Sequence, residues 1–170
     1  MTPQLPARGF TLVELVVTLT IVGIVAATAY PRFANQQGFQ SRAFFEQVQE
    51  GIKFAQKAAI AQRKRVFVTI SATTVQACYT AVCGGGGVPV TDPTTGLALV
   101  LTAQDARGVA FSAVALATAT PTFAFDGLGR PRNAAGVLLT LVTTINVNST
   151  AGGDINRAIY IEPQTGYVHT

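Results

Sequence analysis

The sequence predicts an α+β fold in which a long N-terminal helix packs against antiparallel β-sheet. Two observations support this prediction. The first 65 residues or so have helical character, and the remainder, residues 66–170, holds only short strand-like runs separated by turn residues. A long helix followed by short strands is the order typical of α+β domains.

The first part of the helical stretch, residues 10–30, is almost entirely apolar and holds one charge, Glu14, near its start. About 20 consecutive apolar residues are enough for a helix to cross a bilayer, so the length predicts a transmembrane helix. A carboxylate within such a helix costs roughly 2.5–3.5 kcal/mol at the membrane centre. The presence of Glu14 therefore requires a functional reason.

The second part, residues 31–65, is predicted to continue the helix with an amphipathic pattern. Pro31 lacks a backbone N–H and is expected to kink or loosen the helix, and Gly38 adds a second weak point. The basic run at 63–65 ends the helix, where cations suit the negative end of the helix dipole. Apolar residues recur at intervals of three and four, which predicts a face packed on a sheet: Phe45, Val48, Ile52, Ala55 and Ala59.

The rest of the chain is predicted to form short strands. β-Branched and aromatic residues alternate with turn signals rich in glycine and proline. The expected strands are 66–70, 74–79, 97–101, 109–115, 122–125, 137–147, 158–161 and 167–169.

The composition favours a membrane-tethered chain over a free cytosolic enzyme. Of the 170 residues, 49% are hydrophobic and only 12% are charged. The formal net charge of +4 is compatible with an acidic surface or a nucleic acid as partner, but it is specific to neither.

Side chains that carry catalysis or bind metals are scarce. His169 is the one histidine and lies second from the C-terminal residue, so no Ser-His-Asp or Cys-His arrangement is expected inside the domain. The acids outside the apolar run are scattered, without metal-ligand or acid–base spacing. The glycines at 84–87 lack the Gly-Lys-Ser/Thr ending of a phosphate-binding loop. We therefore expect no enzyme activity, no catalytic residues, no metal and no cofactor.

The two cysteines, Cys78 and Cys83, are separated by four residues and flanked by turn residues. A second cysteine pair and a nearby histidine are both missing, so the spacing is poor for a zinc site. A disulfide that closes a hairpin in an oxidising compartment fits better than two free thiols. Closing so short a loop adds only about 2 kcal/mol.

The N-terminus can be interpreted in three ways. It could be a secretory signal with a small-residue cleavage site at residues 27–29, but the apolar run is long for such signals and carries Glu14 in its first turn. It could be a plain anchor, which leaves Glu14 unexplained. A cut between Gly9 and Phe10 would instead create an amine one helical turn from Glu14. The two charges could then neutralise each other within a chain or between neighbouring chains.

The segment ARGFTLVELVVTLTIVGIVAATAYPRF, residues 7–33, resembles the N-terminus of type IV prepilins and type II secretion pseudopilins. The resemblance implies that residues 1–9 are a leader peptide, which prepilin peptidase removes by cutting after Gly9. It also implies that the new amine of Phe10 is methylated. Glu14 is then the fifth mature residue, whose carboxylate in that family meets the N-terminal amine of an adjacent subunit during assembly.

Looser strings further along are similar to the GspH/FimT-like minor pilins. They are AQKAAIAQRKRVFVTIS, FAFDGLGRP and IYIEPQTGYV. Minor pilins of mannose-sensitive haemagglutinin pili are similar as well. The resemblance implies a leader at 1–9, a transmembrane and assembly helix at 10–30, an amphipathic continuation at 31–65 and a β-rich globular part at 66–170.

Arg130 and Arg132 are candidate DNA-binding residues. On a turn shaped by glycine and proline, two arginines could place their guanidinium groups on successive phosphates. The string GRPR resembles the Gly-Arg-x-Arg signature of FimT-like pilins that bind DNA. In those proteins the signature lies near the C-terminus, whereas 38 residues follow Arg132 here. The alternative is a strand-connecting turn with solvated arginines.

The expected protein is a minor pilin or pseudopilin, anchored once in the bacterial inner membrane with a periplasmic C-terminal domain. It would join other pilins in a type IV pilus or a type II secretion pseudopilus, in an initiation or tip complex. The alternative is a tip-displayed pilin that binds DNA for uptake through Arg130 and Arg132.

Overall fold

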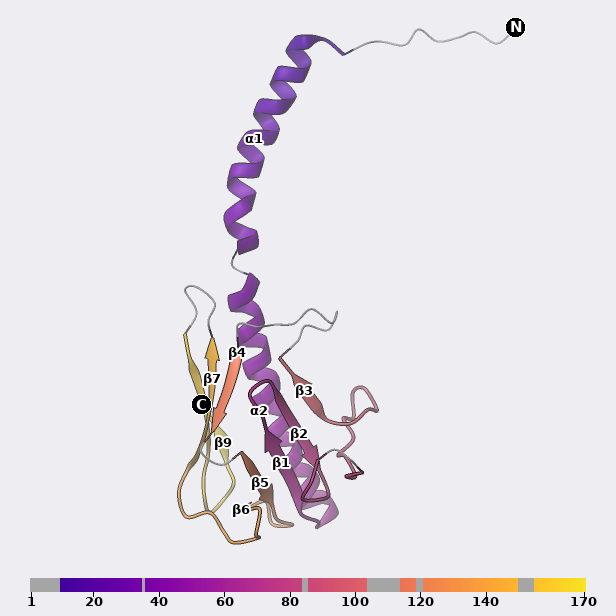
Figure 1. The fold of residues 1–170 in the computed structure, drawn as a ribbon, viewed down its shortest axis with the longest axis vertical. Helices are drawn as coiled ribbons and strands as arrows, with labels where there is room; N and C mark the ends of the chain where they lie inside the picture. Colours follow the sequence, from indigo (N-terminus) through magenta and orange to yellow (C-terminus); the bar gives the residue numbers. More distant parts are fainter. Residues whose placement is uncertain (1–9, 35, 84–85, 104–113, 119–120, 150–154) are drawn as a thin grey trace, which may run out of the picture. The chain divides into compact units, whose positions relative to one another are not determined.

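The computed structural model describes residues 10–34, 36–83, 86–103, 114–118, 121–149 and 155–170. The chain divides into two compact units, Met1–Gln36 and Gln37–Thr170, and each is described by itself. The first holds helix α1, and the second holds helix α2 and nine strands (Figure 1).

Helix α1 spans Leu12–Ala34. Thr11 caps its N-terminus: the Thr11 hydroxyl accepts from the Glu14 backbone N–H at 3.3 Å, and the Thr11 carbonyl accepts from the Leu15 N–H at 3.1 Å. The hydroxyls of Thr18 and Thr20 donate to backbone carbonyls three residues earlier in the helix. The threonine hydroxyls of the first turns are thus bonded within the helix, while its apolar side chains from Leu12 to Val25 are exposed. Within the part of the chain that the structure describes, no helix has the length and apolar character needed to cross a membrane.

Helix α2 spans Gln36–Gln62 and packs through the predicted apolar stripe. Val48, Ile52 and Ala59 are completely buried, and Phe45 and Ala55 are buried beside them. On the outward face, Arg42 pairs with Glu46 at 3.1 Å and Lys53 pairs with Glu50 at 2.9 Å. The amphipathic interpretation of this helix is confirmed.

The C-terminus of α2 is closed by two backbone hydrogen bonds. The Lys64 N–H donates to the Ala59 carbonyl and the Arg63 N–H donates to the Ile60 carbonyl, both at 3.2 Å. This is a Schellman motif, in which the residue after the C-cap adopts a left-handed conformation and is usually glycine. Here the position is occupied by Arg63 with φ of 50°, and no other non-glycine residue among those described has a positive φ.

The strands form two antiparallel sheets, which confirms the predicted α+β class. The five-stranded sheet has the order β3-β2-β1-β5-β6. In its centre, Val68 faces Ala77 on one side and Phe123 on the other. Its strands are β1 (Val66–Ile70), β2 (Thr74–Cys78), β3 (Val100–Thr102), β5 (Thr122–Phe125) and β6 (Pro131–Asn133).

The four-stranded sheet has the order β4-β7-β8-β9. Ile145 of β7 faces Ile159 of β8 in its centre, and both side chains are completely buried. Its strands are β4 (Val114–Thr118), β7 (Thr143–Ser149), β8 (Arg157–Ile161) and β9 (Val168–His169).

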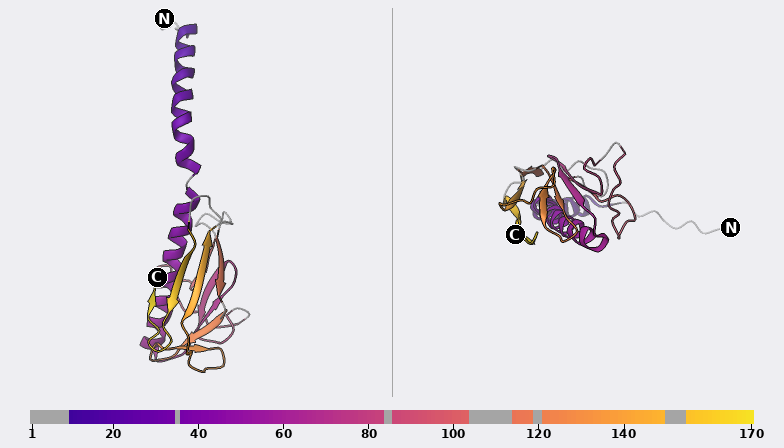
Figure 2. Two further views of the ribbon diagram at one scale, coloured as in Figure 1. Left: turned by 90° about the vertical axis from the view of Figure 1, so that its left-hand side faces the viewer. Right: turned by 90° about the horizontal axis from the view of Figure 1, so that it is seen from below.

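A single hydrophobic core unites α2 with strands from both sheets. It includes Val48 and Ile52 from the helix, Phe123 from the first sheet, and Ile145 and Ile159 from the second. The turned views show the strands of both sheets running alongside α2 (Figure 2). Among the described residues, every member of this core lies between Phe44 and Val168, so the second unit has a core of its own.

Most predicted strands are found, with three differences. The strand predicted at 97–101 is displaced to Val100–Thr102, and the one predicted at 137–147 begins only at Thr143. Strand β6 was not predicted, because Gly129 and Pro131 indicate a turn. In the structure Pro131 lies on an edge strand, where its missing N–H leaves no ladder bond unmade. Most of the strand predicted at 109–115 lies outside the described residues.

The strained position at the end of α2 yields the first prediction. Replacing Arg63 with glycine should raise the free energy of unfolding by about 1 kcal/mol, because glycine adopts positive φ without the steric cost that a side chain carries. Urea unfolding of residues 37–170 measures the change. Lys64→Gly is the matched control and should destabilise, since Lys64 has no positive φ to relieve. A loss of stability in Arg63→Gly would contradict this account.

Candidate functional site

The predicted assembly residues lie at the start of α1, with Gly9 outside the described residues. Phe10 is 74% exposed and precedes the Thr11 cap. Glu14 is exposed in the first helical turn, the third residue of α1. A carboxylate at this position is stabilised by the positive end of the helix dipole, typically by 0.3–1 kcal/mol. The helix itself therefore tolerates Glu14.

Sequence reasoning missed a local signal in this segment. Thr11-Leu12-Val13-Glu14 has the spacing of a capping box, in which a threonine and a glutamate three residues later satisfy helix N-terminal N–H groups. The structure shows one half of it, the bond from the Glu14 N–H to the Thr11 hydroxyl. The start of α1 just after the proposed cleavage point could thus have been predicted.

In the second unit, Asp126 organises the turn between β5 and β6. One carboxylate oxygen accepts from the backbone N–H groups of Leu128 and Arg130, both at 2.9 Å. The other accepts from the guanidinium groups of Arg130 at 3.2 Å and Arg132 at 2.9 Å. Gly129 has φ of 80°, which the turn requires.

These contacts set the charge state of Asp126. Burial by itself would raise its pKa, but the N–H of Arg130, the Arg132 guanidinium, the N–H of Leu128 and the charge of Arg130 together hold the pKa below its ordinary value. The carboxylate is thus charged at neutral pH and bridges both arginines.

The two candidate DNA-binding residues are therefore brought together, and both are engaged with Asp126. Arg132 also donates to the Gly136 carbonyl at 2.9 Å. The side chains keep 36% exposure for Arg130 and 23% for Arg132. Sequence reasoning identified the arginines but did not connect them to the acid four residues before Arg130.

The structure joins two of the strings that carried the minor-pilin resemblance. The side-chain amide of Gln56 on α2 donates to the carbonyl of Gly129 at 2.9 Å and to that of Thr165 at 3.2 Å. Gly166, with φ of 68°, lies so close to Gly129 that a side chain there would strike the Gly129 carbonyl. The turns at 126–130 and 162–166 are thus fixed on α2 through one glutamine.

The predicted disulfide is present. Cys78, the last residue of β2, is bonded to Cys83, with Cα atoms 5.6 Å apart. Beyond it, Tyr79 accepts a hydrogen bond from the Gln62 side chain at 2.6 Å, which ties the segment after β2 to the end of α2. The bridge therefore closes a short loop beside the helix terminus.

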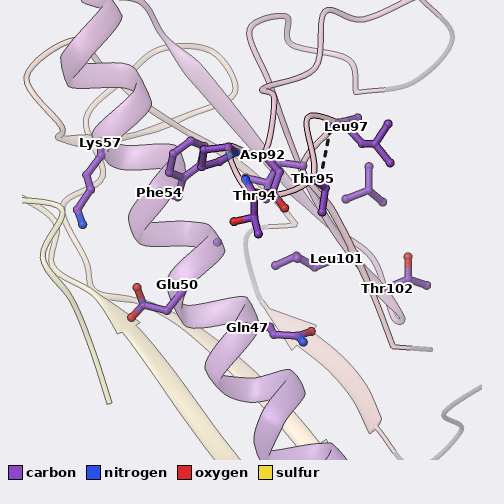
Figure 3. A pocket seen from close by; sticks show the side chains of 15 residues that line it. Gln47, Glu50, Phe54, Lys57, Asp92, Thr94, Thr95, Leu97, Leu101 and Thr102 are labelled. Atoms are coloured by element: carbon purple, nitrogen blue, oxygen red, sulfur yellow. Dashed lines mark hydrogen bonds between the residues drawn. The ribbon is translucent and has the colours of Figure 1, made fainter. Parts of the chain in front are cut away.

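A groove of about 940 Å³ lies between α2 and residues 92–102 (Figure 3). Phe54 lies across it from Asp92 and Thr94, and Leu101 packs on Gly51. Both acids in its lining have partners: Glu50 pairs with Lys53, and Asp92 accepts from the Thr94 N–H at 2.8 Å. The groove provides packing surface, hydroxyl groups and the ammonium group of Lys57.

His169 is also engaged within the fold. Its ring lies between those of Tyr160 and Tyr167, with ring centres 5.4 and 5.5 Å away, and its Nε2 lies 3.0 Å from the Glu162 carboxylate. Among the described residues there is no group of histidines, cysteines and acids that could hold a metal ion.

The N-terminal motif and the fold both resemble those of type IV pilin-like proteins. Residues 6–30 match the prokaryotic N-terminal methylation motif. They include Gly9, Phe10 and Glu14, and most of α1.

The fold is similar to that of the type IV minor pilin FimU of Pseudomonas aeruginosa, known from a crystal structure. The match has a TM-score of 0.50 and 12% sequence identity, and it covers 79% of this chain and 87% of that one. At this identity the likeness concerns the fold. No curated protein matches the chain significantly in sequence.

The Asp126 turn generates a pH prediction. Asp126→Ala should lower the free energy of unfolding at neutral pH by about 2–3 kcal/mol, because two partly buried arginines and two N–H groups lose their acceptor. The folded-state pKa lies below the unfolded value of about 3.9. The stabilisation is therefore complete above that value and is lost as pH falls through the folded pKa.

Urea unfolding of residues 37–170 at a series of pH values measures both effects. The difference between wild type and Asp126→Ala should shrink in acid. Glu46→Ala removes an exposed acid that also pairs with an arginine, and it should change little at any pH. A difference that stays constant down to the most acidic folded condition would contradict the role of Asp126.

Proposed function

We propose that this chain is a minor pilin or pseudopilin subunit without catalytic activity. Prepilin peptidase cuts it after Gly9, and the amine of Phe10 is methylated. Residues 10–30 hold it in the bacterial inner membrane, with the C-terminal unit in the periplasm, until it assembles with other pilins. The filament is a type IV pilus or a type II secretion pseudopilus, and the subunit acts in its initiation or tip complex.

One observation carries the proposal. The methylation motif at 6–30 leads directly into a helix whose large apolar side chains, from Leu12 to Val25, are all exposed. An apolar surface of this extent needs a covering, either lipid or the helices of neighbouring subunits. The second unit does not need α1 for its core, so α1 is available for anchoring and assembly.

Glu14 places a negative charge in the apolar helix that takes part in assembly. Between packed apolar helices a lone carboxylate is costly unless a cation pairs with it. Cleavage creates such a cation on Phe10 of every subunit, and the Glu14 side chain is exposed and can reach a neighbour's amine. The pairing also fixes the axial position of one subunit against the next.

DNA binding through Arg130 and Arg132 is the second candidate function. The positive charge gathered around their turn favours it. The engagement of both guanidinium groups with Asp126 reduces what they can offer to phosphates.

The charge pairing at Glu14 can be tested by substitution. Glu14→Ala should leave the chain inserted and cleaved, because the span only becomes more apolar. Its incorporation into filaments should fall roughly tenfold or more, since the neighbour's amine is left unpaired in an apolar interface. Quantitative immunoblots of sheared filaments and of membranes measure the two pools.

Glu46→Ala is the matched control, because it removes an exposed acid from α2 and should leave incorporation unchanged. Normal incorporation of Glu14→Ala would refute the pairing. Loss of the chain from the membrane would show that Glu14 acts before assembly.

A further inference from the structure

The charge of this chain is concentrated at one end of the second unit. Five of the twelve lysines and arginines gather there around the carboxylate of Asp126, and these six groups together carry a formal charge of +4. The other seven cations are balanced by seven acids. We call this surface the basic end and define it by the five cations Arg63, Lys64, Arg65, Arg130 and Arg132.

Two glycine turns bring these cations together from separate parts of the sequence. A side chain on Gly127 would lie 3.1 Å from the Arg63 backbone, and one on Gly136 would lie 3.0 Å from the Arg65 guanidinium. Arg132 donates to the carbonyl of the same Gly136. The end of α2, the Asp126 turn and the turn at 133–137 thus form one continuous surface.

Aliphatic side chains stand out between the cations. Leu128 and Val137 each follow one of the two glycines and are 70% and 62% exposed. Ile60 is exposed too and lies against Gly129 in the first turn. Arg63, Lys64 and Arg65 are themselves exposed. The basic end therefore exposes both cations and aliphatic side chains.

The backbone at Arg63 supports a role for this surface. A left-handed arginine costs about 1 kcal/mol or more relative to glycine at the same place. The helix dipole alone does not account for it, because Lys64 and Arg65 already place cations at the helix terminus. Strain retained at one residue is a feature of functional sites.

We propose that the basic end binds the surface of a membrane that carries anionic phospholipids. The exposed run from Arg63 to Arg65 pairs with headgroup phosphates, while Arg130 and Arg132, bonded to Asp126, add to the positive potential. Leu128, Val137 and Ile60 enter the shallow apolar layer beneath the headgroups. Nucleic acid is the less favoured partner, because sequence-independent binding of bases uses aromatic stacking, and Leu128, Val137 and Ile60 offer no ring for it.

The expected strength follows from the charges. Each cation near an anionic surface contributes about fivefold in partitioning, so removing three of them should weaken binding roughly a hundredfold. The attraction should fall when salt rises from about 50 to 200 mM, as the Debye length shortens. The aliphatic contribution should persist at high salt.

The test uses the full chain held in phosphatidylcholine nanodiscs, so that α1 is already in lipid. Vesicles of phosphatidylcholine, with or without phosphatidylglycerol, are added and floated, and the captured nanodiscs are quantified. Anionic vesicles should capture them and neutral vesicles should not. Equal capture by both would show transfer of α1 and would overturn the proposal.

Three variants locate the surface. Arg63→Gln/Lys64→Gln/Arg65→Gln should lose capture, and Leu128→Ser/Val137→Ser should lose the part that survives high salt. The matched control Arg42→Gln/Lys53→Gln/Lys57→Gln removes the same formal charge from α2 itself and should retain capture. Thermal unfolding by circular dichroism confirms that each variant is folded.

Equal loss in the control would indicate net charge rather than a site, and would overturn the proposal. So would capture of a DNA duplex that depends on Arg130 and Arg132 while anionic vesicles are ignored, which would instead support the second candidate function. None of these outcomes depends on filament assembly, so their failure leaves the proposed pilin function untouched.

Discussion

The burial of one face of α2 is the constraint on which the rest of the second unit depends. Val48, Ile52 and Ala59 are completely buried, and they fix the rotation of the helix against both sheets. With that rotation set, Gln56 points to the turns at 126–130 and 162–166 and bonds both. The same rotation places the C-terminal Schellman turn against Gly127, which aligns the basic run with the β5–β6 turn.

The two units differ in where they place their apolar side chains. In the second, apolar groups are buried in a shared core, and Asp126, Gln56 and His169 find partners inside the fold. In α1, the backbone and hydroxyl groups are satisfied within the helix while the apolar side chains are exposed. A chain with one exposed apolar helix and a second unit that has its own core suits a subunit whose helix becomes buried against other molecules.

The sequence predicted correctly those helices and strands that have a strong local pattern of apolar or β-branched residues. The stripe on α2 and the strands β1, β2, β5 and β8 were predicted because their periodicity or β-branched content is strong. The late start of β7 and the existence of β6 could not be predicted from the residues of those segments alone. Residues 137–142 have strand-like composition, but Leu138 makes only an isolated bridge to Arg132, and Pro131 is tolerated only because β6 is an edge.

Some residues of the candidate site could be predicted from the sequence and others could not. The prepilin motif was visible because its spacing is specific, and the capping box at Thr11 and Glu14 could have strengthened it. Asp126 was missed as a partner of the arginines, although an aspartate before Gly127 in a glycine-rich turn is a recognisable signal for side-chain bonding to nearby N–H groups. The role of Gln56 depends on contacts more than seventy residues away, and no local pattern reveals it.

The central claim is that the chain is matured at the junction between Gly9 and Phe10. Mass spectrometry of the N-terminal peptide, from protein isolated from membranes of a host that carries prepilin peptidase, tests it most directly. The account predicts a peptide that begins with N-methylated Phe10, and the uncut chain in a host without the peptidase. A mature N-terminus at Tyr30 would contradict it and would establish an ordinary secretory signal in place of an assembly helix.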